Sequence, residues 1–332
     1  FMIFSSYGWD GQSDGETWKE ELRLADVAAD QGFDCMWSTE HHFADYSFIP
    51  DNIQLMSHLA AKYRHIDVGT AAVILPWHDP LRVAEQVVML DMLSEGRLRF
   101  GMGRGLARRE FEGFRLPMDE SRARFDESSA MIIKALETGF IESDGPMYKQ
   151  PRIEIRPRPQ YSMKGRLYSV ATSEESVESV AKLGGVRMVM FADRPWEMRA
   201  PAINLGRELH LKHHGVPAPT PMLTDFAICA DNNEKAEEMA RKYQGKFTES
   251  NFYHYEFLGQ HFANVKGYDG YQEKAEFARK AGGDLKPAVE NFMKSASWGT
   301  PDRILRELER RREIVGDFEL NVSFRFGGTP YE

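Results

Sequence analysis

The 332-residue chain has little cysteine, no long apolar run and a deficit of positive charge. Its two cysteines, Cys35 and Cys229, are too few for a disulfide framework and favour a reducing, cytoplasmic compartment. No apolar run reaches the roughly 18 residues that a membrane span needs, so we expect no membrane partner. The net charge of −9 disfavours nucleic acid and anionic membranes as partners, because both call for a basic surface.

The start of the chain lacks the basic region and apolar core of a secretory signal peptide. Phe1 precedes Met2, and we interpret it as a residue left by a tag, with the natural chain starting at Met2. Hydrophobic residues make up 42% of the chain and charged residues 28%, which is typical of a globular protein with a large core.

Eight short apolar runs indicate strands, and segments of helical periodicity separate nearly all of them. The runs lie at 2–7, 33–38, 66–75, 98–100, 167–171, 187–191, 223–230 and 318–324. Strands that are apolar on both faces and alternate with helices predict a parallel sheet covered by helices. Eight such units in one α/β domain, 1–332, favour a closed (β/α)8 TIM barrel over an open doubly wound sheet.

Three segments depart from a regular barrel. Residues 139–165 are irregular, and 152–156 could add a small side hairpin. Residues 245–297 show many aromatics but no clear alternation, and so long a segment in a compact domain is usually functional or mobile. We therefore expect a long insertion at 245–297, before the last βα unit, that acts as a lid. Only 327–332 follow the last strand, so the eighth outer helix is expected to be absent from this chain.

The stretch 97–107 joins a strand to a glycine-spaced loop and then to a charged helix that should begin near Arg108. Gly101, Gly103 and Gly105 remove side chains where the backbone turns tightly or a ligand approaches. Arg104 stands among them with a planar guanidinium suited to phosphate. Two interpretations stay open, a phosphate-binding loop and a glycine-rich strand end packed inside the barrel.

In such barrels the ligand binds at the carboxyl ends of the strands, which selects the residues that follow each run. These candidates are Glu40, His41, His42, Ala71, Ala72, Trp77, His78, Arg104, Thr172, Ser173 and Ser176. Glu40-His41-His42 could bind a metal, but adjacent residues point to opposite sides and no third ligand follows at suitable spacing, so we expect none. Hydrogen-bonded histidines that close the loop are the structural alternative. The three hydroxyl residues could simply cap a helix, yet the same groups also bind phosphate.

Several motifs resemble one known family. They are Trp-Ser-Thr-Glu-His-His-Phe at 37–43, Gly-Thr-Ala-Ala-Val-Ile-Leu-Pro at 69–76, Pro-Leu-Arg-Val-Ala-Glu-Gln at 80–86, the stretch 90–106 and Tyr-Ser-Val-Ala-Thr-Ser at 168–173. Weaker matches follow at 266–269 and 299–301. Together they resemble the bacterial luciferase-like, flavin-dependent monooxygenases, and within them the luciferase α-subunit branch.

This resemblance implies a barrel that binds FMN, reduced during turnover, and inserts one oxygen atom from O2 into a small apolar organic substrate through a flavin C4a-peroxy adduct. His41 matches the family's essential histidine, with Glu40 and His42 beside it, and is suited to proton transfer near neutral pH. The cofactor contacts that the resemblance implies are Ala71, Ala72, Arg104, the N–H groups of Leu106 and Ala107, Ala171, Thr172, Ser173 and Ser176. Ala71-Ala72 occupies the position of the family's non-proline cis peptide below the flavin.

Phe43, Trp77 and the aromatics of 247–271 are the expected substrate contacts and lid. Gly103 stands where luciferases have a cysteine, Ala107 where they have a tyrosine and Thr172 where they have a glutamate, so we do not expect light emission. The resemblance further implies a separate flavin reductase, because no second nucleotide-binding domain is visible, and a dimer through the helix at 79–93. Two alternatives are an oxidoreductase that uses the deazaflavin F420 for hydride transfer and a non-catalytic flavin-binding partner subunit.

Overall fold

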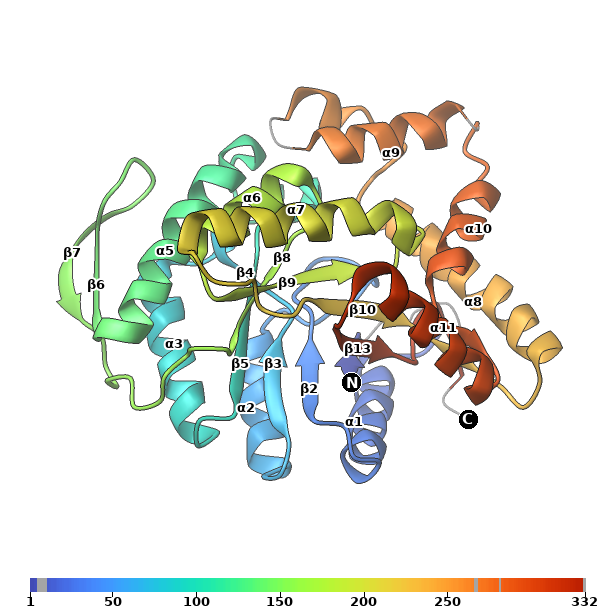
Figure 1. Cartoon of the computed structure of the whole chain (residues 1–332), viewed down its shortest axis with the longest axis horizontal. Helices are drawn as coiled ribbons and strands as arrows, with labels where there is room; N and C mark the ends of the chain where they lie inside the picture. Colours follow the sequence, from blue (N-terminus) through green and yellow to red (C-terminus); the bar gives the residue numbers. More distant parts are fainter. Residues whose placement is uncertain (5–10, 266–267, 281, 331–332) are drawn as a thin grey trace.

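The computed structural model describes residues 1–4, 11–265, 268–280 and 282–330. Eight strands form the central parallel sheet, in the order β1 (Met2–Ile3), β2 (Cys35–Ser38), β3 (Asp67–Thr70), β5 (Leu98–Gly103), β8 (Leu167–Val170), β9 (Val186–Phe191), β10 (Met222–Phe226) and β13 (Glu319–Ser323). A short strand, β4 (Val73–Ile74), also pairs with β5. Strand β13 lies against β1 and brings the barrel close to closure, which confirms the predicted (β/α)8 architecture (Figure 1).

Helices cover the outside of this barrel. They are α1 (Asp14–Asp30), α2 (Asn52–Lys62), α3 (Pro80–Leu93), α4 (Arg108–Gly113), α5 (Ser121–Thr138), α6 (Glu174–Leu183), α7 (Trp196–His214), α8 (Asn233–His254) and α11 (Pro301–Val315). Several begin at polar N-caps that accept a backbone N–H of the first turn, among them Asp51, Asp79 and Ser173. No helix in the described ranges is long and apolar enough to cross a membrane.

The interior of the barrel is packed rather than open. Gly69 faces Trp37 across the β2–β3 pair, and a Cβ at position 69 would lie 2.4 Å from the indole ring. At the amino ends of the strands, Arg99 pairs with Asp67 at 2.7 Å, and Tyr168 Oη donates to Glu319 Oε2 at 2.9 Å. These contacts close the amino end, so the carboxyl ends of the strands are left for a ligand.

The segment 245–297 is helical rather than irregular, which differs from the sequence-based expectation. Helix α8 continues to His254, and η3 (His261–Asn264), α9 (Asp269–Lys280) and α10 (Lys286–Ser295) follow it. The extension of α8 buries polar as well as apolar side chains, including Thr248 and Ser250, which hides the helical pattern in the sequence. In Figure 1, α9 lies at the top of the view, on the side toward which the arrow of β2 points.

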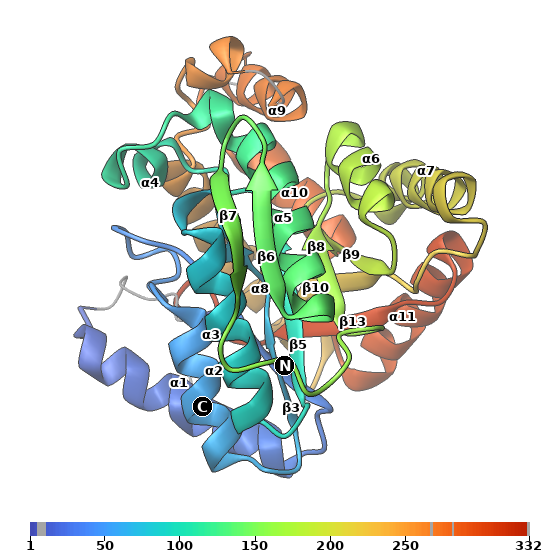
Figure 2. The ribbon, with the colours of Figure 1, turned by 90° about the vertical axis from the view of Figure 1, so that its left-hand side faces the viewer.

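The remaining elements are short. β6 (Phe140–Asp144) and β7 (Lys149–Glu154) form the expected side hairpin, but it begins earlier than the 152–156 segment suggested, and it runs beside α5 (Figure 2). β11 (Ile228–Cys229) pairs with β12 (Trp298–Gly299), and η1 (Leu75–Trp77) and η2 (Met118–Glu120) are single turns. After β13 the described residues 324–330 contain no helix, in agreement with the expectation for this chain.

Candidate active site

Glu40 holds together the loop that follows β2. Its Oε1 lies 2.6 Å from His78 Nε2 and 3.2 Å from His42 Nε2, and its Oε2 accepts the N–H of Ile74 at 2.8 Å. Burial opposes ionisation, but these hydrogen bonds outweigh it and lower the pKa of Glu40. Burial likewise opposes the charge of His78, yet the contact with Glu40 raises its pKa. Glu40 and His42 therefore form the loop-closing cluster that the sequence left open as the structural alternative.

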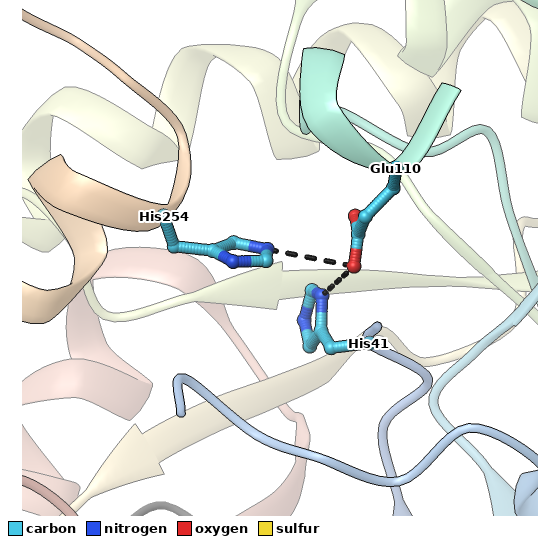
Figure 3. Close-up of side chains that lie close together, drawn as sticks. All are labelled: His41, Glu110 and His254. Carbon is cyan, nitrogen blue, oxygen red and sulfur yellow. Dashed lines mark hydrogen bonds and ion pairs between the residues drawn. The ribbon is translucent and has the colours of Figure 1, made fainter. Parts of the chain in front are cut away.

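His41 points elsewhere, toward Glu110 of α4 and His254 at the end of α8 (Figure 3). Glu110 Oε1 lies 3.2 Å from His41 Nδ1 and 3.5 Å from His254 Nε2, and it accepts the backbone N–H of His42 at 2.8 Å. Glu110 and His254 are buried, whereas the side chain of His41 keeps 14% of its surface exposed. The structure thus separates His41 from its neighbours Glu40 and His42.

The charges of this cluster follow from its burial. Burial disfavours the ionised carboxylate, but the contacts with His41 and His254 dominate and lower the pKa of Glu110 to about 2. Burial is the main cause that lowers the pKa of His254 to about 4, so its imidazole is neutral at pH 7. An ionised carboxylate therefore lies between one neutral buried imidazole and the more accessible imidazole of His41.

The same three side chains could bind a divalent transition metal. Their donor atoms lie within 4.8 Å of one another, and this is the sole group of three such residues found in the described part of the chain. Sequence reasoning missed Glu110 and His254, because both come from distant segments. One signal in the sequence was available. Helical spacing places Glu110 and Phe111 of α4 on the same side as its N-cap, Ala107, and this apolar side indicates that Glu110 points inward.

A second cluster lies where α5 and α6 meet the loop after β5. Arg104 Nη1 is 3.8 Å from Glu175 Oε2, and Arg122 Nε is 3.5 Å from Glu175 Oε1. Arg122 Nη2 donates to Ser176 Oγ at 2.9 Å, and Ser173 Oγ lies 2.7 Å from Ser176 Oγ. Burial and the nearby charge of Arg104 lower the pKa of Arg122. Asp126 Oδ1 also lies 3.5 Å from Arg122 Nη1, so two carboxylates balance the two guanidinium groups, and the cluster offers an anion N–H and O–H donors rather than net charge.

This cluster corrects one part of the sequence-based interpretation. The luciferase glutamate was expected to be lost because Thr172 replaces it, but Glu175 brings a carboxylate to the same cluster. Thr172 instead places its hydroxyl 2.9 Å from Tyr271 Oη of α9, and its carbonyl accepts Arg199 Nη1 at 2.9 Å. Arg122 was not among the candidates, since it stands in a charged helix where an arginine ordinarily faces solvent.

The glycines of β5 and its loop serve packing. A Cβ at Gly103 would lie 2.8 Å from Ile74 Cδ1, and one at Gly105 would lie 2.9 Å from Ile74 Cγ2, where φ is also +84°. The side chain of Arg104, by contrast, turns away and stacks on Tyr268, with Cζ 4.0 Å from the ring centroid. The glycines thus agree with the packing interpretation, and the phosphate-binding interpretation stays a prediction. Leu106 follows in the loop, and Ala107 is the N-cap of α4, where its methyl group provides no cap hydrogen bond.

The peptide bond between Ala71 and Ala72 is cis, as the resemblance implied. Asn52 Nδ2 donates to the carbonyl of Ala72 at 3.0 Å, and the N–H of Ala71 donates to the carbonyl of Ser38 at 2.7 Å. Ala171 is buried at the end of β8, where its N–H donates to the carbonyl of Val189. These contacts fix the backbone between the two side-chain clusters.

The two residues expected to contact substrate differ in position. Trp77 is buried and stacks on Phe114, with ring centroids 5.5 Å apart. Phe43 is 62% exposed and packs over Gly113, on the solvent side of α4. A larger aromatic wall, of which only Phe247 was among the aromatics expected from the sequence, adjoins His254 through Tyr46, whose ring stacks on the imidazole at 4.5 Å. Its members are Phe4, Tyr46, Phe226, Phe247, Phe292 and Phe326.

With this geometry in place, comparison with known proteins identifies the family. The family described as "Luciferase-like monooxygenase" matches residues 1–317. The chain belongs to the luciferase-like monooxygenases. Members of this family are oxidoreductases, and the resemblance seen in the sequence is confirmed.

Individual relatives span nearly the whole chain. The alkanal monooxygenase alpha chain of Photobacterium leiognathi is 25% identical over 99% of this chain and 93% of its own length. The crystal structure of monooxygenase RslO1 from Streptomyces bottropensis is 25% identical with a TM-score of 0.74, covering 100% of this chain and 93% of that one.

More distant solved structures share the fold of this luciferase-like chain. The oxygenating constituent of 3,6-diketocamphane monooxygenase from Pseudomonas putida, a type II Baeyer-Villiger monooxygenase in complex with FMN, has a TM-score of 0.72 and 17% identity, covering 98% and 91% of the two chains. An F420-dependent secondary alcohol dehydrogenase has a TM-score of 0.69 and 16% identity, covering 92% and 89%.

Proposed function

We propose that this chain is the oxygenating component of a two-component, FMN-dependent monooxygenase. One atom of O2 enters a small apolar organic substrate, the other leaves as water, and a separate reductase supplies the reduced flavin. The observation that carries the proposal is the presence of two side-chain clusters, one with Arg104 and Arg122 beside Glu175 and one with His41 bound to the carboxylate of Glu110. The cis peptide at Ala71-Ala72 lies in the chain between them.

The residues present fit the cofactor. Arg122 Nε is buried and donates no hydrogen bond within the described residues, although it faces Glu175, and a phosphate would accept from it. Arg104, Ser173, Ser176 and the N–H groups of Leu106 and Ala107 would complete the phosphate site, with Thr172 and Ala171 at its edge. The backbone at Ala71 and Ala72 would support the ring. When bound, reduced FMN supplies the two electrons that activate O2.

The chain itself would bind and orient the substrate and protect the reacting centre from water. The aromatic wall and Trp77 provide an apolar environment for the substrate and exclude water. His41 Nε2 would accept a proton and return it as the reaction proceeds. Phe43 lies outside the aromatic wall, so we assign it to the entrance of the site rather than to the substrate itself. The helices of 245–297 would act as the lid over the reacting centre.

The lid proposal rests on the contacts of 245–297 with α4 and with the loop after β5. Arg108 of α4 donates to both carboxylate oxygens of Glu256, at 2.7 and 3.2 Å, and Tyr268 Oη donates to the carbonyl of Gly105 at 3.1 Å. An opening of this segment would expose the phosphate site and His41 together. We further propose a cytoplasmic location and a dimer through α3, with no nucleic-acid or membrane partner.

The test of this function is a purified sample supplied with a generic flavin reductase, NADH and FMN. We expect O2-dependent product from at least one aldehyde, cyclic ketone or phenol in a screen of apolar substrates. Reduction of F420 by a substrate without O2 would instead favour hydride transfer on the same barrel. Flavin binding without any turnover, unchanged in His41→Ala, would indicate a non-catalytic partner subunit.

A further inference from the structure

Glu110 provides the carboxylate that contacts His41, and the proposed function gives this carboxylate no step of its own. It lies on α4 with both neighbours of its carboxylate coming from other elements, His41 from the loop after β2 and His254 from α8. The carboxylate is buried, yet it is not part of the phosphate cluster or of the loop-closing cluster around Glu40. A buried carboxylate that contacts a proposed proton-transfer group requires a physical account.

The hydrogen bonds of Glu110 Oε1 determine the tautomer of His41. The backbone N–H of His42 can only donate, and it holds Oε1 at 2.8 Å. An ionised carboxylate can only accept, so His41 Nδ1, 3.2 Å away, must carry the proton of the contact. His41 Nε2 then has the free lone pair, and among the described residues no hydrogen-bond partner occupies it. His41 is thereby oriented as a base whose reacting atom is Nε2.

The other groups around Glu110 do not compete for this role. His254 stacks on Tyr46, and its Nε2 lies 3.5 Å from Glu110 Oε1, farther than His41 Nδ1 at 3.2 Å. Burial lowers the pKa of His254 to about 4 and keeps its imidazole neutral. Tyr46 and Tyr255, the remaining titratable groups packed here, stay neutral because burial raises their pKa values. Glu110 Oε1 is therefore left to accept the Nδ1–H of His41.

We infer that Glu110 is a positioning residue, which holds His41 as the Nδ1–H tautomer and so directs Nε2 toward the reacting centre. The use of His41 in proton transfer rests on the proposed function, whereas the hydrogen bonds that fix its tautomer do not depend on that function. A proton taken up at His41 Nε2 gives an imidazolium whose second N–H already points at the carboxylate. Return of that proton restores the starting tautomer, so the cycle leaves Glu110 ionised throughout.

The test is histidine side-chain NMR on the flavin-free protein labelled with ¹⁵N-histidine. The His41 signals are assigned by their loss in His41→Gln. We expect the wild type to show the Nδ1–H tautomer, and Glu110→Gln to shift His41 toward the Nε2–H tautomer. Glu127→Gln is the matched control, because Glu127 of α5 accepts the N–H groups of Met147 and Tyr148 far from the site.

Two results would overturn the inference. One is an Nε2–H tautomer of His41 in the wild type, a measurement that needs no variant to fold. The other is an unchanged tautomer of His41 in a folded Glu110→Gln. Glu110→Asp keeps the carboxylate on a shorter side chain, and we expect it to retain more of the Nδ1–H tautomer than Glu110→Gln does.

Turnover provides an independent readout. With a substrate found in the screen, Glu110→Gln should lower kcat at least tenfold and leave the FMN dissociation constant within twofold. A parallel loss of kcat and FMN affinity would show a merely structural role and contradict the inference. Absence of turnover in the wild type would defeat the proposed function alone, since the NMR result is obtained without flavin.

Discussion

Replacing Arg122 by alanine should weaken FMN while leaving riboflavin binding nearly unchanged. The guanidinium already donates to Ser176 Oγ, and its Nε is buried beside Glu175. A phosphate placed between Arg122 and Arg104 would gain at least one charge-assisted hydrogen bond from it, about 1.5–3 kcal/mol or roughly 10- to 150-fold in affinity. Riboflavin lacks the phosphate, so its dissociation constant should change by less than about twofold on the same reasoning.

The cost of this change to the folded protein should be small. Arg122 has ion pairs with Asp126 and Glu175 at 3.5 Å, but the charge of Arg104 opposes them, which contributes to the lowered pKa of Arg122. We expect the free energy of unfolding of the flavin-free protein to change by less than about 1 kcal/mol. Fluorescence titration with FMN and riboflavin, together with urea unfolding, measures both quantities.

The control lies on the same helix. Arg124 pairs with Glu120 at 2.6 Å, and Arg124→Ala should leave the affinity for both flavins unchanged. Equal losses for FMN and riboflavin in Arg122→Ala, or no loss for either, would refute the assignment of this cluster to the phosphate.

Four further changes test other parts of the structure. Arg104→Ala should also weaken FMN by about 1.5–3 kcal/mol, and unchanged affinity in the same titration would remove it from the site. Gly103→Ala should destabilise the fold by about 1–3 kcal/mol in urea unfolding, because the added methyl group would clash with Ile74 Cδ1. Adding Ile74→Val removes that Cδ1 atom and should restore much of the lost stability. No rescue by Ile74→Val would refute the proposed clash. Arg311→Met should lower the free energy of unfolding by about 3–5 kcal/mol, because it removes the charge that balances the buried Asp225 carboxylate 2.9 Å away. Arg312→Met removes only an exposed ion pair, with Asp317, and should lower the free energy of unfolding by about 1 kcal/mol or less. The buried, neutral His254 stabilises the folded protein at a pH above its unfolded pKa of 6.5, and this stabilisation is lost as the pH falls toward its folded pKa of about 4. His254→Phe should therefore reduce the slope of the unfolding free energy against pH in that window by up to about 1.4 kcal/mol per pH unit. An unchanged slope would contradict the neutral buried state of His254.

The fold was predictable because its signal is local. Alternating apolar runs and helical segments located the eight barrel strands, and Pro80 and Ser173 marked helix starts that the structure confirms. The end of α8 was missed because buried polar residues such as Thr248 and Ser250 break the apolar periodicity there. Local pattern fails where tertiary contacts, rather than composition, decide which side chains are buried.

The candidate site was predictable only where its residues follow a strand. His41 and Arg104 were found from their positions after β2 and β5. Glu110, Arg122 and His254 were not, because each lies on a charged or poorly patterned helix and meets its partners only after the barrel closes. The same long-range contacts showed that Glu40 serves the loop and not the group around His41.

The most direct measurement of the central claim is isotope labelling. The reductase-coupled reaction is run under ¹⁸O2 with a substrate that the screen identifies, and the product is examined by mass spectrometry. The account predicts one ¹⁸O atom in each product molecule, with formation dependent on FMN and reduced at least tenfold in His41→Ala. A product that carries no ¹⁸O and forms equally well without O2 would contradict it.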